Sequence, residues 1–169
     1  MKQYRKFLHY LSTFLRDAAT VMLTVMICTY FLEITRRTII HKSFLWIQEL
    51  NVLLVVWVVF FGAAHMYLSA NLLNVDFLYV KSKGLLRLIW TLVIHLVSIF
   101  ILYVFARYGY TYMMHLLPTK TNAMVISNAW TAAPLVISST CMILGWVSKM
   151  YEAFEEYGKY KEKRREKNG

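Results

Sequence analysis

The chain has 169 residues, of which 59% are hydrophobic, 16% aromatic and 17% charged, and its formal net charge is +10. This composition is too apolar for a soluble domain of this size and indicates several membrane spans joined by short charged loops. In a soluble protein the positive charge would suggest nucleic-acid binding. Here basic residues that flank membrane spans explain it better, because such residues set the orientation of the spans.

The first predicted element begins in a basic segment, residues 1–17, whose apolar residues recur at helical spacing. An uncharged stretch follows and ends at Glu33, and no small-residue cleavage site of a signal peptide precedes that residue. We therefore predict an uncleaved first span over 14–35, with Arg16 and Glu33 extending to the water interface at its two ends.

The second predicted span covers 44–70 and contains an apolar run of membrane length. Residues 50–70 are twenty-one consecutive residues without a charged side chain, and about 20 residues suffice for a helix to cross a bilayer core. Trp46 and Glu49 lie at the entrance of this run, and Asp76 lies beyond its exit. Both ends therefore suit the water interface.

Two further spans are predicted in the second half of the chain. Residues 71–84 are too few and too polar to cross, and their pattern fits either an extended link or a short interfacial helix, of which we favour the helix. A third span over 87–107 ends in a cluster of tyrosines, which is typical of the membrane interface. After a link that contains Pro118, a fourth span is predicted over 130–149, with Pro134 in its first turns, where a missing N–H costs least.

These elements predict an all-α integral membrane protein with four transmembrane helices. Residues 1–158 form one four-helix membrane domain, and residues 159–169 form a basic tail. Four spans place both ends of the chain on one side of the membrane. The segments outside the spans hold fourteen lysines and arginines on that side and five on the other side. The positive-inside rule then predicts that both ends lie in the cytoplasm.

Few side chains in the predicted spans could carry chemistry. Glu49 could cap its own helix, where backbone N–H groups are free, or contact a partner. His65 and His95 could ligate a b-type haem, although their depths differ by roughly 7 Å along the helix axes.

Cys28 and Cys141 each lie in an apolar run, so we expect them to behave as small buried hydrophobic side chains rather than to form a disulfide or a zinc site. An ion transporter would need acidic groups near mid-membrane, so we expect no transport by this chain alone.

Two further features suggest contacts with other helices. Gly62, Ala63 and Ala64 make a small patch that lets another helix approach closely, and packing within the chain explains it better than docking. The spans also carry more large aromatic side chains, Trp57 and Trp90 among them, than four helices can bury among themselves. This surplus permits a broad contact with a larger membrane protein.

The stretch from Trp46 to Phe77 resembles the small membrane subunit of tripartite ATP-independent periplasmic (TRAP) transporters, the DctQ-like family. A W-x-x-E entrance, a later tryptophan, a G-A pair and a polar V-D pair carry the resemblance, here Trp46, Glu49, Trp57, Gly62, Ala63, Val75 and Asp76. The chain departs from the family pattern at Leu68 and Leu72, where many members have a basic residue and a histidine.

The resemblance implies a non-enzymatic component of the bacterial inner membrane, without a cofactor or a nucleic-acid partner. Its partners would be membrane lipids, a periplasmic substrate-binding protein, and a large membrane subunit that moves the substrate and sodium sites in an elevator motion. The small subunit would anchor the immobile scaffold and help to dock the binding protein. The substrates would be organic acids, of the sialic acid or C4-dicarboxylate class. A haem-binding redox subunit and a small self-assembling exporter remain as alternatives.

Overall fold

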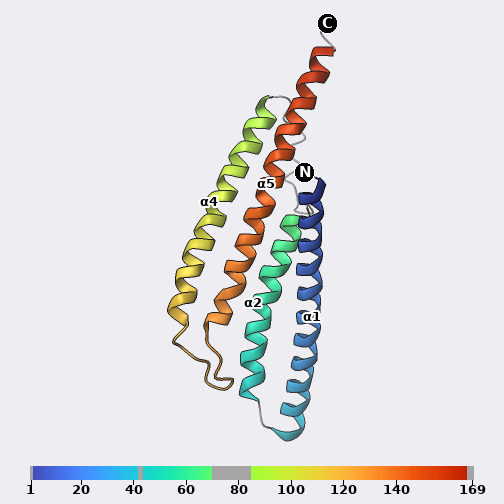
Figure 1. Ribbon diagram of the computed structural model, residues 1–169. Helices are drawn as coiled ribbons and strands as arrows, with labels where there is room; N and C mark the ends of the chain where they lie inside the picture. Colours follow the sequence, from blue (N-terminus) through green and yellow to red (C-terminus); the bar gives the residue numbers. More distant parts are fainter. Residues whose placement is uncertain (1, 42–43, 70–84, 167–169) are drawn as a thin grey trace.

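The computed structural model describes residues 2–41, 44–69 and 85–166. These residues form four long α-helices that lie side by side (Figure 1). Each helix is long and apolar enough to cross a membrane, which confirms the prediction of an all-α protein with four transmembrane helices. The helices are α1 (Lys2–Ile40), α2 (Leu45–Leu68), α4 (Leu85–Leu116) and α5 (Ala129–Glu166).

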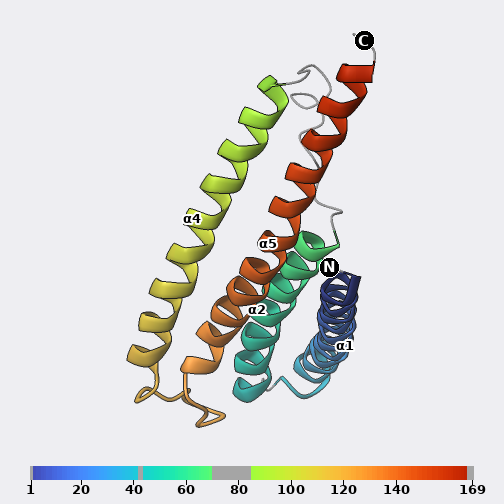
Figure 2. The same cartoon turned by 45° about the horizontal axis from the view of Figure 1, so that its top comes forward.

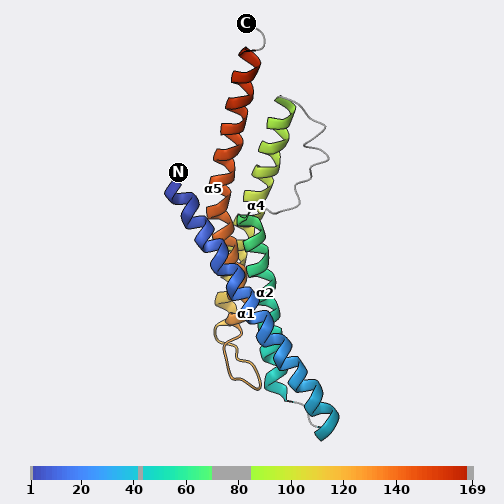
Figure 3. The same cartoon turned by 90° about the vertical axis from the view of Figure 1, so that its right-hand side faces the viewer.

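The helices stand in a row in the order α4, α5, α2, α1 (Figure 1 and Figure 2). α5 packs on both α4 and α2, α2 packs on α1, and α1 also touches α5. When the row is viewed from its side, α1 crosses α2 obliquely (Figure 3). Helices in lipid gain little free energy by hiding apolar surface from the lipid tails, so a row with much exposed apolar surface is compatible with a membrane protein.

The connections lie at opposite ends of this row. α1 begins and α5 ends at the same end, which we name the terminus end (Figure 1). The α1–α2 corner and the loop 117–128 between α4 and α5 lie at the other end, which we name the loop end. This placement fits four crossings, because an even number of crossings returns the chain to the side on which it began.

Three helices run further than the predicted spans. α1 continues through the basic residues after Thr35 and ends at Ile40, because the next residue, His41, has a φ of 56° that terminates the helix. α4 continues past Arg107 and stops before Pro118, and α5 runs through most of the basic tail. A charged side chain does not interrupt the hydrogen bonds of a helix, so the helices continue past the residues that bound the predicted spans. The predicted interfacial helix at 71–84 lies outside the described residues.

A small apolar core forms where α1, α2 and α5 meet. Its buried members are Leu15, Ala19, Phe61 and Ala64. Cys141 of α5 packs against this core, as expected of a thiol in an apolar run. Cys28 is instead exposed, because its position on α1 turns away from the core.

Polar contacts join α1 to α2 at several levels. Near the terminus end, the Ser12 hydroxyl lies 2.8 Å from Nδ1 of His65. Further along the pair, the Thr29 hydroxyl donates to Oδ1 of Asn51 at 2.7 Å. Hydrogen bonds of this kind hold transmembrane helices together in hydrocarbon, each by about 0.6 kcal/mol on average.

Glu33 makes a further contact at the loop end. Its carboxylate accepts the backbone N–H of Phe44 at 3.2 Å, and Phe44 immediately precedes the first turn of α2. Only 8% of the surface of Glu33 is exposed. The predicted extension of this side chain into water is therefore wrong, because the N–H groups at the start of a helix attract a carboxylate.

Gly109 marks a close approach of α4 to α5. A Cβ at this position would lie 3.0 Å from Cδ2 of Leu135, whereas a Cβ at Gly62 would meet no atom within 4 Å. We therefore expect Gly109→Val to lower the free energy of unfolding of the isolated chain by about 1–3 kcal/mol more than Gly62→Val does. Unfolding both variants with SDS in mixed detergent micelles measures the difference. Equal midpoints would contradict close packing at Gly109.

Candidate functional site

The loop between α4 and α5, residues 117–128, has a defined, hairpin-like shape. An isolated β-bridge pairs Lys120 with Ser127. The backbone N–H of Thr121 donates to the carbonyl of Ile126 at 2.8 Å. The hydroxyl of Ser127 also donates to carbonyl groups at the end of α4. These bonds fix the loop against the helix that precedes it.

Glu49 of α2 binds the tip of this loop. Its Oε1 accepts the N–H of Ala123 at 2.9 Å, and its Oε2 accepts the N–H of Met124 at 2.8 Å. Hydrogen bonds from backbone N–H groups to a carboxylate are charge-assisted and short. Glu49 was predicted to cap α2 or to contact a partner, but these bonds leave α2 and stay within the chain. We name this contact the Glu49 clamp.

Val125 follows the clamped amides and has a φ of 57°. This left-handed conformation is strained for a β-branched residue, by roughly 1–3 kcal/mol. The loop holds it because hydrogen bonds fix the neighbours on both sides, Met124 and Ile126. The side chain of Val125 is 62% exposed, so the loop presents an apolar group in a fixed position.

Trp57 attaches the start of α5 to α2. Its indole N–H donates to the carbonyl oxygen of Trp130 at 3.0 Å, and the two tryptophan rings lie 6.1 Å apart. In a regular helix this carbonyl would accept the N–H of residue 134, but Pro134 has none. The indole therefore supplies the donor that the proline removes. Pro134 lies beyond the first four residues of α5, so its missing N–H is not one of the groups that a helix leaves free.

Trp46 lies at the α1–α2 corner. It is 44% exposed, and its ring lies 5.7 Å from the ring of Phe44. The guanidinium of Arg36 lies over the same phenylalanine ring, 3.2 Å from its centre, in a cation–π contact. The corner is therefore an aromatic and basic cluster of the kind found at membrane interfaces.

The small-residue patch of α2 is divided between two environments. Ala64 is fully buried in the core, so packing within the chain accounts for it. Gly62 borders open space and Ala63 is exposed, so packing within the chain does not account for these two. Asp76 lies outside the described residues.

The structure does not bring His65 and His95 together. His65 binds Ser12 of α1, whereas His95 lies on α4, and α5 stands between α2 and α4 in the row (Figure 1). Within the described ranges, no group of three histidine, cysteine or acidic side chains is placed to hold a metal ion. The arrangement of the helices therefore gives the haem alternative no support.

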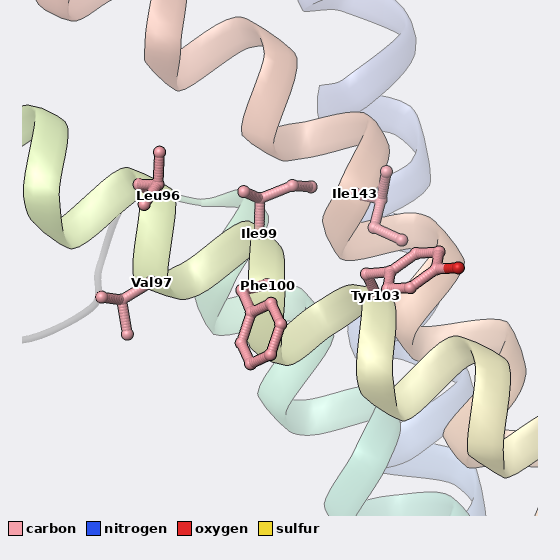
Figure 4. Close-up of a pocket in the computed structure, with 6 residues that line it drawn as sticks. All are labelled: Leu96, Val97, Ile99, Phe100, Tyr103 and Ile143. Atoms are coloured by element: carbon pink, nitrogen blue, oxygen red, sulfur yellow. The ribbon is translucent and has the colours of Figure 1, made fainter.

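An open groove of about 580 Å³ runs along α4 where it meets α5 (Figure 4). Its lining residues are Leu96, Val97, Ile99, Phe100, Tyr103 and Ile143. The hydroxyl of Tyr103 points away from the other lining side chains (Figure 4). The lining of the groove is therefore apolar. An apolar lining would remove water from the carboxylate of an organic acid without replacing its hydrogen bonds. The groove suits an apolar chain rather than a charged substrate.

Sequence reasoning missed the groups to which Glu49 and Trp57 bind. These groups are backbone N–H and carbonyl groups, which every loop or helix start provides, so no pattern of side chains identifies them. One signal was available, because Pro134 follows Trp130 by four residues. A proline inside a helix leaves the carbonyl four residues earlier without its usual donor.

Comparison with known proteins assigns the chain to a family. The family model of the DctQ component of tripartite ATP-independent periplasmic transporters matches residues 26–156, which is most of the chain and includes all of α2 and α4. No curated protein matches the chain significantly. The match agrees with the resemblance at Trp46 to Phe77 and with four membrane-spanning helices. The chain therefore belongs to the DctQ family, the small membrane components of TRAP transporters.

Proposed function

We propose that this chain is the small membrane subunit of a sodium-coupled TRAP transporter that takes up an organic acid of the sialic acid or C4-dicarboxylate class. It anchors and widens the immobile scaffold of a large elevator-type subunit, and it helps to dock the periplasmic substrate-binding protein. The family match over residues 26–156 supports the identity of the complex.

The polar side chains of α1 bind other groups of this chain, and this supports the scaffold role. Ser12, Thr29 and Glu33 of α1 each bind a group of α2 or at its start. A pathway for sodium or an acid would instead need such groups to line a cavity that holds water. Polar groups that lock two helices together give the rigidity that an immobile frame requires.

The loop end supports the docking role. Because the segments on the terminus side carry most of the basic residues, we place that side in the cytoplasm of a bacterial inner membrane and the loop end in the periplasm. The loop 117–128 would then face the binding protein. The Glu49 clamp fixes this loop beforehand, so docking would cost little conformational entropy.

The two ends of the chain would have separate roles in this arrangement. Residues 1–158 would form the membrane domain. The basic residues of 159–169 would form a tail on the cytoplasmic side, whose positive charge is attracted to the anionic lipid of that leaflet.

Co-purification tests the assembly. The tagged chain, extracted from its native membrane in mild detergent, should bring with it a much larger membrane protein. Uptake into sealed vesicles should require both membrane proteins, sodium and the binding protein. Elution of the tagged chain alone would contradict the assembly, and sodium-coupled uptake by this chain alone would contradict the scaffold role.

A further inference from the structure

The first half of α1 combines a buried apolar face with a stripe of polar side chains on its exposed surface. The face toward α2 and α5 holds buried side chains, among them Leu8, Leu15 and Ala19. Beside this buried face, the exposed surface carries polar side chains three or four residues apart, a spacing that places them on one side of a helix, while large apolar side chains such as Tyr10 and Phe14 occupy the side directly opposite the core. We name this set the α1 polar stripe: His9, Thr13, Arg16, Asp17, Thr20 and Thr24. All of its members except the half-buried Thr13 are exposed.

Two contacts between the helices fix the depth of this stripe. Ser12 is level with His65, and Thr29 is level with Asn51, because each pair is hydrogen-bonded. The segment 16–24 therefore lies beside the part of α2 between Asn51 and His65. That part belongs to the uncharged run of α2, which is roughly 30 Å long, the thickness of a hydrocarbon core. The stripe thus lies at the depth of the hydrocarbon.

Arg16 and Asp17 are the members that lipid accommodates worst. Nε of Arg16 lies 3.0 Å from Oδ1 of Asp17, and the two side chains are 56% and 61% exposed. A long arginine can extend to the interface, but an aspartate is too short to do so. Thr20 and Thr24 are better tolerated, because their hydroxyls donate to carbonyls one turn earlier. Ionisable side chains in spans almost always face protein or water rather than lipid.

We propose that a transmembrane helix of the large subunit packs on the α1 polar stripe and offers a charged or hydrogen-bonding side chain to Arg16 and Asp17. The identity of the partner rests on the proposed function. The threonines of the stripe are small, so another helix can approach closely. Large aromatic side chains are exposed elsewhere on the molecule, such as Phe14 on another side of α1 and Phe100 on α4, and these suit lipid rather than a polar contact.

A photo-crosslinking amino acid tests the contact in the assembled complex. At Thr20 it should give a product of this chain with the large subunit. At Phe100, which is 67% exposed on α4, it should give none. Absence of the Thr20 product, or a Thr20 product that contains two copies of this chain, would overturn the proposal. Labelling of Thr20→Cys in the complex by a membrane-impermeant maleimide would also overturn it, because the stripe would then lie in water.

A substitution tests the role of the ion pair. Asp17→Leu should lower the amount of large subunit that co-purifies by roughly three- to tenfold, the range expected for a polar contact between transmembrane helices. Arg107→Leu on α4 is the matched control and should have no such effect, because that arginine is also exposed and binds Thr111 of its own helix at 3.0 Å.

The outcomes separate this inference from the proposed function. The amount of each variant in the membrane and its circular dichroism show whether it folds. If the unchanged chain brings down no large subunit, the proposed function fails. If the unchanged chain does bring it down and the folded Asp17→Leu variant brings down as much, only the docking of the stripe fails.

Discussion

Glu49→Ala should release the loop 117–128 from α2. The substitution leaves the N–H groups of Ala123 and Met124 without the carboxylate that accepts them. We therefore expect hydrogen exchange at these two amides to become roughly tenfold faster, while exchange in the middle of α2 stays unchanged. Hydrogen–deuterium exchange of the purified chain in detergent, followed by mass spectrometry, measures the change. Glu49→Gln should give a smaller acceleration, because the amide keeps one acceptor oxygen.

Glu33→Ala is the control for this experiment. It removes another carboxylate at the loop end, but that carboxylate binds Phe44 at the start of α2 rather than the loop. Exchange at Ala123 and Met124 should therefore remain slow in Glu33→Ala. If both variants loosened the loop equally, the effect would come from a general loss of structure at this end, and the Glu49 clamp would be contradicted.

The same variant tests the proposed docking role. If the loop is held in place to receive the binding protein, Glu49→Ala should raise the concentration of binding protein needed for half-maximal uptake, because more of the loop must be ordered on docking. The amount of assembled complex should not change. Faster exchange in the loop together with unchanged uptake would leave the clamp intact and contradict its role in docking.

Hydropathy predicts the fold of this chain well because the bilayer imposes a length on each crossing. It predicts helix ends less well, and α1 and α4 show why. The predicted spans end at or next to Arg36 and Arg107, but the helices continue past both residues. The conformation of His41 and the proline at position 118 end those helices instead, and these are local backbone effects.

The candidate site was predictable only in part. A carboxylate at the entrance of an apolar run is unusual enough to single out Glu49, but its partners lie 74 and 75 residues further along the chain. The small residues Gly62 and Ala63 indicate a place for close approach, yet the sequence does not say which neighbour approaches. Arg16 shows the same limit, because only the contacts of Ser12 and Thr29 with α2 reveal its depth.

Trp57→Phe should loosen the junction between α2 and α5. Phenylalanine keeps an aromatic ring but has no N–H, so the carbonyl of Trp130 loses the donor that replaces the missing N–H of Pro134. A hydrogen bond of this kind contributes about 0.5–1.5 kcal/mol to stability. We expect the free energy of unfolding in SDS mixed micelles to fall by a similar amount. Loss of contacts between the rings of Trp57 and Trp130 would add to this effect, so a second substitution is needed to isolate the hydrogen bond.

Pro134→Ala provides that second substitution. Alanine has an N–H that can donate to the carbonyl of Trp130, as in a regular helix, so the carbonyl no longer depends on the indole. In this background Trp57→Phe should cost clearly less, and the double-mutant cycle should give a coupling of about 1 kcal/mol. Additive effects would show that Trp57 holds α5 through ring packing alone. A measured coupling would mean that α2 fixes the start of α5 through the indole of Trp57. Because α2 also binds the preceding loop through Glu49, a single helix would then hold both the loop 117–128 and the helix that follows it.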